Sequence, residues 1–332
     1  MARLFSFILM LFIFSYAHGQ SFKIATVVPD GTKWMKEIRK GAKEITQRTE
    51  GRVKFRFYPG GVMGNDASVL RKIRIGQLHG GAITGGGVSQ IYPDGQIYSL
   101  PFAFKSYEEV DYVRKKMDRL ILEGIKKKGF ISFGLSEGGF AYLMSDEPLR
   151  TIDELRSQKV WVPEGDRISR TAFEAIGVSP IPLPLTDVLT GLQTGLINTV
   201  GTSPIGAIAL QWHTRVRYLT DVPLLYLYGT LVVQRKTFEK LSLKDQKVMK
   251  EIMGKTFRII SKQNRKDNQG ARQALQHQGI KFVLPQDERL GQWNHQITKA
   301  VDELVEQGVF TDEMLKTLKG HLREFRNGTR TK

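Results

Sequence analysis

The stretch from Lys159 to Pro204 constrains the fold most strongly, because strand and helix patterns alternate along it. Residues 159–163 are rich in β-formers and end on proline, and residues 166–176 have helical periodicity. Residues 189–195 predict a second helix that ends on glycine, and residues 196–200 predict another strand. Strands that alternate with helices indicate an α/β fold with a largely parallel sheet.

A shorter copy of this pattern lies earlier, between Leu70 and Gly85, where a helix, a glycine and an apolar strand follow one another. Asp66 is a candidate N-cap of that helix. Both predicted strands run directly into small polar residues, at 84–87 and at 201–203. Because ligands of α/β sheets lie at the carboxyl ends of strands, the two strand ends predict two lobes that face one cleft.

The first 19 residues have the pattern of a cleavable signal peptide. Arg3 provides a positive start, an apolar run of about 13 residues follows, and Ala17 to Gly19 form a small-x-small cleavage site. No later stretch approaches 18 uninterrupted apolar residues, and the chain contains no cysteine for a disulfide or lipid anchor. We therefore expect an exported protein located in a bacterial periplasm.

The rest of the chain predicts two lobes built from discontinuous segments. Strands near 130–144 and 225–234 would cross between the lobes, with a hinge at residues 136–140 and 228–231. Ser242 opens a helical run to about Gln278 that is long enough to brace both lobes. We assign lobe I to residues 20–138 and about 231–265, lobe II to 139–230 and about 266–325, and a tail to 326–332.

Several functional classes find no support in the residues. No nucleophile elbow, phosphate-binding Gly-x4-Gly-Lys motif or pair of histidines at metal-ligand spacing is present, so we expect no enzyme, metal or cofactor. An enzyme would need a titratable pair in the cleft. The formal charge of +17 invites a nucleic-acid or membrane-surface role, but the basic residues are spread along the chain. We expect a solvated basic surface and no nucleic-acid partner.

The segments 52–64, 69–78 and 100–104 resemble those of the DctP family, the solute-binding proteins of tripartite ATP-independent periplasmic (TRAP) transporters. The likeness continues through 159–164 and 177–184, and further through 192–195 and 218–220, in the right order. The resemblance implies a two-lobed periplasmic binding protein fold with hinge strands and a long bracing helix. It also implies a monomeric receptor that closes on a small-molecule ligand and delivers it to the subunits of a membrane permease.

The sequence departs from the family pattern where the ligand would lie. The family places carboxylate-binding arginines at the positions that resemble Trp161 and Ala141, and acidic residues near Thr84 and at 198–202. Because each change removes charge, we expect an atypical, apolar site with hydroxyl donors for a weakly polar or hydrophobic ligand. The residues expected to bind it are Trp161, Thr84, Ala141, Thr202, Ser203, Gly85, Pro29, Val28, Asn198 and Tyr142.

Other interpretations remain open at this point. Trp161 could fill the cleft as core, while Arg167 or Arg170 binds an ordinary organic acid. A second alternative is a periplasmic carrier of lipids or isoprenoids that acts with another envelope partner.

Overall fold

The structure is a computed structural model that describes residues 19–285, 296 and 300–330. The expected signal peptide, apart from Gly19, therefore lies outside the described residues. The sheet of lobe I has the strand order β2-β1-β3-β9-β4, in which β1 runs parallel to β2 and β3, while β9 runs antiparallel to β3 and β4. These strands are β1 (Gln20–Thr26), β2 (Val53–Tyr58), β3 (Gly80–Thr84), β4 (Phe130–Ser145) and β9 (Leu225–Gln234).

Lobe II is built around the far end of β4. There β4 pairs antiparallel with β7 (Thr199–Thr202) and β8 (Tyr218–Thr220), and β8 pairs parallel with β10 (Lys281–Val283). A separate parallel pair is formed by β5 (Trp161–Pro163) and β6 (Ile181–Leu183). The α/β, two-lobed fold predicted from the alternation of strands and helices is confirmed.

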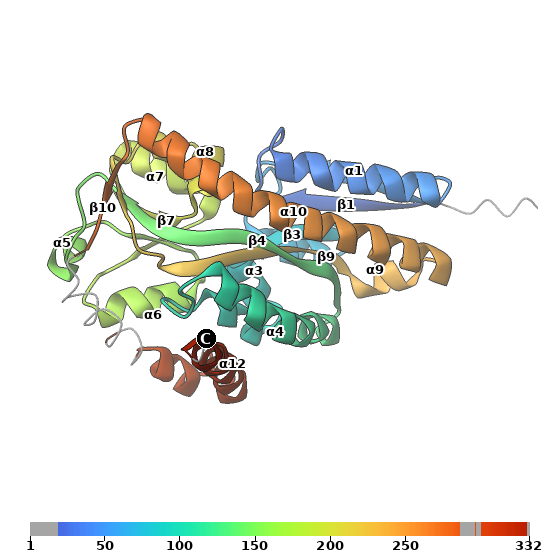
Figure 1. Cartoon of the computed structure of the whole chain (residues 1–332). Coiled ribbons are helices and arrows are strands. Elements are labelled where there is room, and N and C mark those ends of the chain that lie inside the picture. The colour runs from blue at the N-terminus through green and yellow to red at the C-terminus, as the bar shows by residue number, and fades with distance from the viewer. Residues whose placement is uncertain (1–18, 286–295, 297–299, 331–332) are drawn as a thin grey trace, which may run out of the picture.

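The strands β4 and β9 connect the lobes, as expected of a hinge (Figure 1). The two strands predicted at 130–133 and 140–144 are one continuous strand, β4. Its register against β9 shifts between Ser132 and Leu135 and again between Glu137 and Gly139. Gly134 and Gly139 have φ values of 143° and 92°, which side chains rarely allow. These irregularities fall at the predicted hinge.

Helices cover the sheets on both faces, and most begin with a side-chain cap. Thr32, Ser106 and Thr151 each accept a hydrogen bond from a backbone N–H in the first turn of their helix. The helix α2 is capped by Asn65 and not by Asp66, which is its first residue. The shorter and peripheral helices are α1 (Lys33–Arg48), α2 (Asp66–Arg74), α3 (Gly85–Ser89), α4 (Tyr107–Lys127), α5 (Ile152–Arg156), α6 (Arg167–Ala175), α7 (Val188–Thr194), α8 (Pro204–Ala209) and α9 (Arg235–Glu239), with 3-10 turns η1 (Pro93–Ser99), η2 (Leu185–Asp187) and η3 (Trp212–Thr214).

The helix α10 (Leu243–His277) has the predicted bounds, with Ser242 as its N-cap. Phe257 is buried in the core of lobe I, whereas Leu275 is buried in the core of lobe II. Between them, Asn268 accepts a hydrogen bond from the backbone N–H of Ile205 at 3.1 Å and donates to the carbonyl of Gly138 at 3.1 Å. The helix therefore braces both lobes, as Figure 1 shows.

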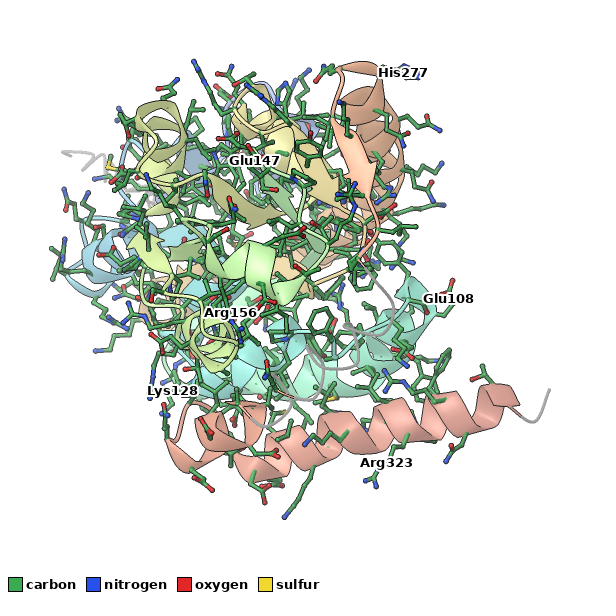
Figure 2. The ribbon with its side chains drawn as sticks, turned by 90° about the vertical axis from the view of Figure 1, so that its left-hand side faces the viewer. Glu108, Lys128, Glu147, Arg156, His277 and Arg323 are labelled. Carbon is green, nitrogen blue, oxygen red and sulfur yellow. The ribbon has the colours of Figure 1, made fainter. Side chains whose placement is uncertain are left out.

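The C-terminal helix α12 (Asp312–Arg330) corrects two boundaries. It runs beneath α4, whose two ends are marked by Glu108 and Lys128 in Figure 2. Arg326 forms an ion pair with Glu109 of α4 at 2.7 Å, and Lys116 pairs with Glu324 at 2.8 Å. The residues of α12 therefore belong with lobe I rather than lobe II, and residues 326–330 continue a helix instead of forming a tail. Residues 300–306 are also helical.

No described helix is both long and apolar enough to cross a membrane.

Candidate functional site

A cavity of about 360 Å³ lies between the two lobes. The chain reaches it at the carboxyl ends of three strands: at Val27 directly after β1, at Thr84 as the last residue of β3, and at Ser203 directly after β7. The end of β5 contributes Pro163, and Leu227 of the connecting strand β9 completes the wall. The two matching strand ends seen in the sequence therefore face the same space, as the geometry of α/β sheets predicts.

Eight of the ten residues expected to bind a ligand line this cavity. Four of them lie in lobe I, at or directly after the ends of β1 and β3. The other four lie in β4, in β5 and at the end of β7. They are Val28, Pro29, Thr84, Gly85, Ala141, Trp161, Thr202 and Ser203.

Asn198 and Tyr142 do not line the cavity. Asn198 lies before the first residue of β7, at the opposite end of that strand from the cavity, and its side chain accepts from the backbone N–H of Lys159 at 2.9 Å. Tyr142 follows Ala141 in β4, and neighbouring strand residues point to opposite faces. Its ring packs under the guanidinium of Arg272, with 5.1 Å from the central carbon to the ring centroid. These two expectations are corrected.

Trp161 presents only its apolar surface to the cavity. Its indole N–H donates to the carbonyl oxygen of Leu183 at 3.0 Å, which joins β5 to β6. The ring meets Trp212 edge to face, with 5.1 Å between centroids, and only 5% of Trp161 is exposed. Trp161 is thus a core residue of lobe II as well as part of the cavity wall.

Of the three hydroxyl groups expected as donors, one already donates to an acceptor within the described part of the chain. Thr84 donates its hydroxyl to Asp66 Oδ2 at 2.6 Å and accepts from the backbone N–H of Gly87. The Ser203 oxygen accepts from the backbone N–H of Gly206 at 3.3 Å. Among the hydrogen bonds of the described residues, none uses the hydroxyl of Thr202. The hydroxyl of Thr202 and the O–H proton of Ser203 are therefore not donated to a protein acceptor in the described part of the chain.

The charged residues that line the cavity are all acidic: Asp66, Glu164 and Asp166. Burial raises the pKa of Asp66, although hydrogen bonds from Thr84 oppose the shift. Asp66 Oδ1 is buried and has no hydrogen-bond partner within the described part of the chain. Burial likewise raises the pKa of Asp166, against hydrogen bonds from Ser169 and Gln96.

Within the ranges that the structure describes, no arginine, lysine or histidine lines the cavity. Arg167 and Arg170, the alternative anion-binding residues, line a different hollow of about 510 Å³ beside Glu174 and Glu303. Arg167 donates there to the side-chain oxygen of Gln307 at 3.1 Å. In the same ranges, no group of three His, Asp or Glu side chains is arranged to hold a metal ion.

Hydrogen bonds connect the two lobes around the cavity. Asn65, before α2, donates to Glu164 Oε2 at 3.0 Å, and Gln96 donates to Asp166 Oδ1 at 2.8 Å. Because Glu164 and Asp166 follow β5, both bonds join lobe I to lobe II. The structure therefore shows the lobes closed on one another.

Residues 24–307 match the profile of the family described as "Bacterial extracellular solute-binding protein, family 7", DctP. The match covers most of the chain. The protein belongs to this family. Members of the DctP family are solute-binding receptors, so the chain is a receptor and not an enzyme.

Individual relatives of this DctP-family protein are distant in sequence. The C4-dicarboxylate-binding periplasmic protein DctP of Rhodobacter capsulatus is 21% identical over 292 residues, covering 86% of each protein. The sugar acid binding protein DctPAm of Advenella mimigardefordensis, solved with galactonate, has a TM-score of 0.85 at 18% identity and covers 92% of this chain and 98% of its own. A TRAP periplasmic solute-binding protein of Desulfovibrio salexigens, solved with orotic acid, has a TM-score of 0.83 at 18% identity, covering 92% and 99%. At these identities the structures show a shared fold.

Sequence reasoning missed several residues that line the cavity of this DctP-family protein. Asp66 and Asp166 carried only helix-start signals, which say nothing about the side of the helix that meets a ligand. Leu225 was expected only as the first residue of a strand, and Leu224 was not assigned to any element. Trp212 follows α8 in a short turn, where no periodic pattern could have indicated its position.

Proposed function

We propose that this protein is the periplasmic receptor of a TRAP transporter for a weakly polar or hydrophobic organic ligand. The ligand would be enclosed between the lobes and delivered to membrane permease subunits by a monomeric receptor. Closure about β4 and β9 would present both lobes to the permease in one fixed arrangement. Binding free energy would supply the shift from open to closed forms.

One observation carries the proposal on the ligand: among the described residues, the charged groups of the cavity wall are three carboxyls, without a cation. An anionic ligand would lose its hydration on entering and would meet like charge instead of a guanidinium. An arginine normally supplies two charge-assisted hydrogen bonds to a carboxylate. The apolar wall formed by Trp161, Phe173, Leu185, Leu224 and Leu225 instead favours an uncharged, apolar body.

The organic-acid alternative has less support. Arg167 and Arg170 lie on the hollow beside Glu303, so they would have to change their positions to reach a ligand in the cavity. The sugar acid, orotic acid and pyroglutamic acid bound by the solved relatives are anions. Their chemistry is therefore a poor guide to the ligand of a cavity without cations.

Native-ligand mass spectrometry tests the proposal. The protein would be purified from its native host without refolding, and its bound molecules would be extracted into organic solvent and, separately, into acidified water. We expect a neutral or weakly polar compound in stoichiometric amount. A carboxylic acid recovered at that stoichiometry would contradict the proposal. A long-chain lipid or isoprenoid would favour the carrier alternative, in which the protein acts with another envelope partner.

A further inference from the structure

Six glycines of the described chain line the cavity, and four of them are explained by packing. A Cβ on Gly85 would lie 2.8 Å from the Tyr228 ring, and one on Gly87 would lie 2.5 Å from Asp66 Oδ2. A Cβ on Gly138 would lie 2.9 Å from Leu227, and one on Gly206 would lie 2.6 Å from Thr202 Oγ1. Real Cβ atoms do not approach other atoms so closely, so the fold itself requires glycine at these positions.

Gly86 and Gly201 are different. The nearest atom to a Cβ on Gly86 would be Thr84 Oγ1 at 3.6 Å, and the nearest to one on Gly201 would be Leu224 Cδ2 at 3.8 Å. Both distances are ordinary van der Waals contacts, and neither residue has a positive φ. Neither the backbone nor the surrounding packing therefore explains the glycine.

Both residues also belong to regular elements, although Gly86 lies in the first turn of a five-residue helix. Gly86 is in α3 and Gly201 is in β7, paired with Leu143 of β4. Glycine destabilises helix and strand interiors relative to alanine, because it loses more backbone freedom on folding. The sequence thus has glycine, which stabilises the fold less than alanine would, at two positions that face the same cavity from opposite lobes.

We propose that Gly86 and Gly201 are specificity-determining residues. The missing side chains leave room for a broad apolar group of the ligand, such as an aromatic or polycyclic ring system, between the lobes. The apolar face of Trp161 and the side chain of Leu224 line the same space. This inference rests on the proposed function, because a wide apolar group needs a cavity that accepts uncharged ligands.

N-phenyl-1-naphthylamine, an uncharged ring compound whose fluorescence increases in apolar surroundings, serves as the probe. The full chain would be freed of co-purified molecules by unfolding and refolding, and then titrated with this probe. We expect the wild type to bind it, and Gly86→Ala and Gly201→Ala each to weaken binding about tenfold, because an added methyl overpacks the occupied cavity. Their thermal midpoints should equal or exceed that of the wild type.

Gly270→Ala is the matched control. Gly270 lies on the exposed side of α10, and nothing lies within 4 Å of an added Cβ. The thermal midpoint of the Gly270→Ala variant should also equal or exceed that of the wild type, and the variant should bind the probe with wild-type affinity. If the wild type binds the probe and both cavity variants bind it equally well, the inference on the glycines is wrong and the proposed function stands. If the wild type does not bind it, both fail.

Discussion

The indole N–H of Trp161 is hydrogen-bonded to the carbonyl oxygen of Leu183. Trp161 therefore offers no free polar group to a ligand. Its hydrogen bond connects β5 to β6 within lobe II, and its ring contributes an apolar face to the cavity. At this position the cavity wall is an apolar surface rather than a hydrogen-bond donor.

This relationship predicts the effect of Trp161→Phe. The variant keeps an aromatic face but removes one of the two donors to the Leu183 carbonyl, which still accepts from the backbone N–H of Glu164. We therefore expect a loss of about 0.5–1.5 kcal/mol in the free energy of unfolding. Binding of N-phenyl-1-naphthylamine should change little. Urea denaturation measures the first effect and fluorescence titration the second. Trp34→Phe is the control, since no hydrogen bond among the described residues uses the Trp34 indole. Equal stability losses in the two variants would contradict the assigned role.

The bond between Asn65 and Glu164 predicts a shift in lobe closure. Glu164→Ala removes one of the bonds between the lobes at an exposed position, so the closed form should lose about 0.5–1.5 kcal/mol. Glu164→Gln retains an acceptor and serves as the control. Small-angle X-ray scattering of the ligand-free protein should give a larger radius of gyration for the alanine variant alone. Identical scattering from all three proteins would show that this contact does not influence closure.

The hinge contains a buried ion pair whose disruption should be costly. Glu137 has 2% of its side chain exposed and accepts from Arg265 at 2.6 Å, and Tyr226 also donates to it at 3.3 Å. Arg265→Met would leave the carboxylate uncompensated, at a cost of about 3 kcal/mol in unfolding free energy. Adding Glu137→Gln should recover part of that loss.

An exposed ion pair provides the comparison for that measurement. Arg39 and Asp30 lie 3.2 Å apart with 44% and 61% of their side chains exposed. Arg39→Met should cost less than about 1 kcal/mol in urea denaturation. If Arg265→Met costs no more than Arg39→Met, the buried pair does not hold the hinge.

The raised pKa of Asp66 predicts a pH dependence of stability. Because burial raises the folded-state pKa above the usual 3.8, the folded state binds more protons than the unfolded state within that interval. The stability of the wild type relative to Asp66→Asn should therefore rise as the pH falls through the folded pKa toward 3.8. Urea denaturation of both proteins across this range measures the difference. If the unfolding free energy of the wild type, relative to that of Asp66→Asn, falls or stays constant as the pH is lowered, the burial of this carboxyl is contradicted.

Glu109→Gln should show the opposite trend. Burial disfavours the charged form of Glu109, but the hydrogen bonds and charges of Arg326 and Lys105 outweigh burial and lower its pKa. The stability that this carboxylate contributes is present above its unfolded pKa and is lost as the pH falls through the lowered value. The wild type should therefore lose stability relative to Glu109→Gln on acidification.

Local and periodic signals predicted the regular elements well. The bounds of α10 followed from a capping serine and an uninterrupted helical pattern, and β9 has the predicted residues 225–234. The strand β4 was predicted in two pieces because glycines at 134, 138 and 139 interrupt its apolar pattern. Pairing with β9 on one side holds these glycines in a single strand, a tertiary effect that no local pattern contains.

The site could be predicted only in part, for a related reason. Strand ends can be located in a sequence, so Thr84 and Ser203 were found. The orientation of a side chain is harder to predict, and Tyr142 was placed in the cavity although it lies on the opposite face of β4 from Ala141. Glu164 meets Asn65 across the two lobes, and their separation of 99 positions leaves no local signal.

The central claim is that this cavity accepts an uncharged occupant and rejects an anion of the same shape. Comparing N-phenyl-1-naphthylamine with 1-anilinonaphthalene-8-sulfonate tests it directly, because the two probes share one ring framework and differ by a sulfonate. Since the described residues place three carboxyls and no cation on the wall, the account predicts that the ligand-free wild type binds the neutral probe at least about tenfold more tightly. Tighter binding of the sulfonate, with displacement by galactonate, would contradict it.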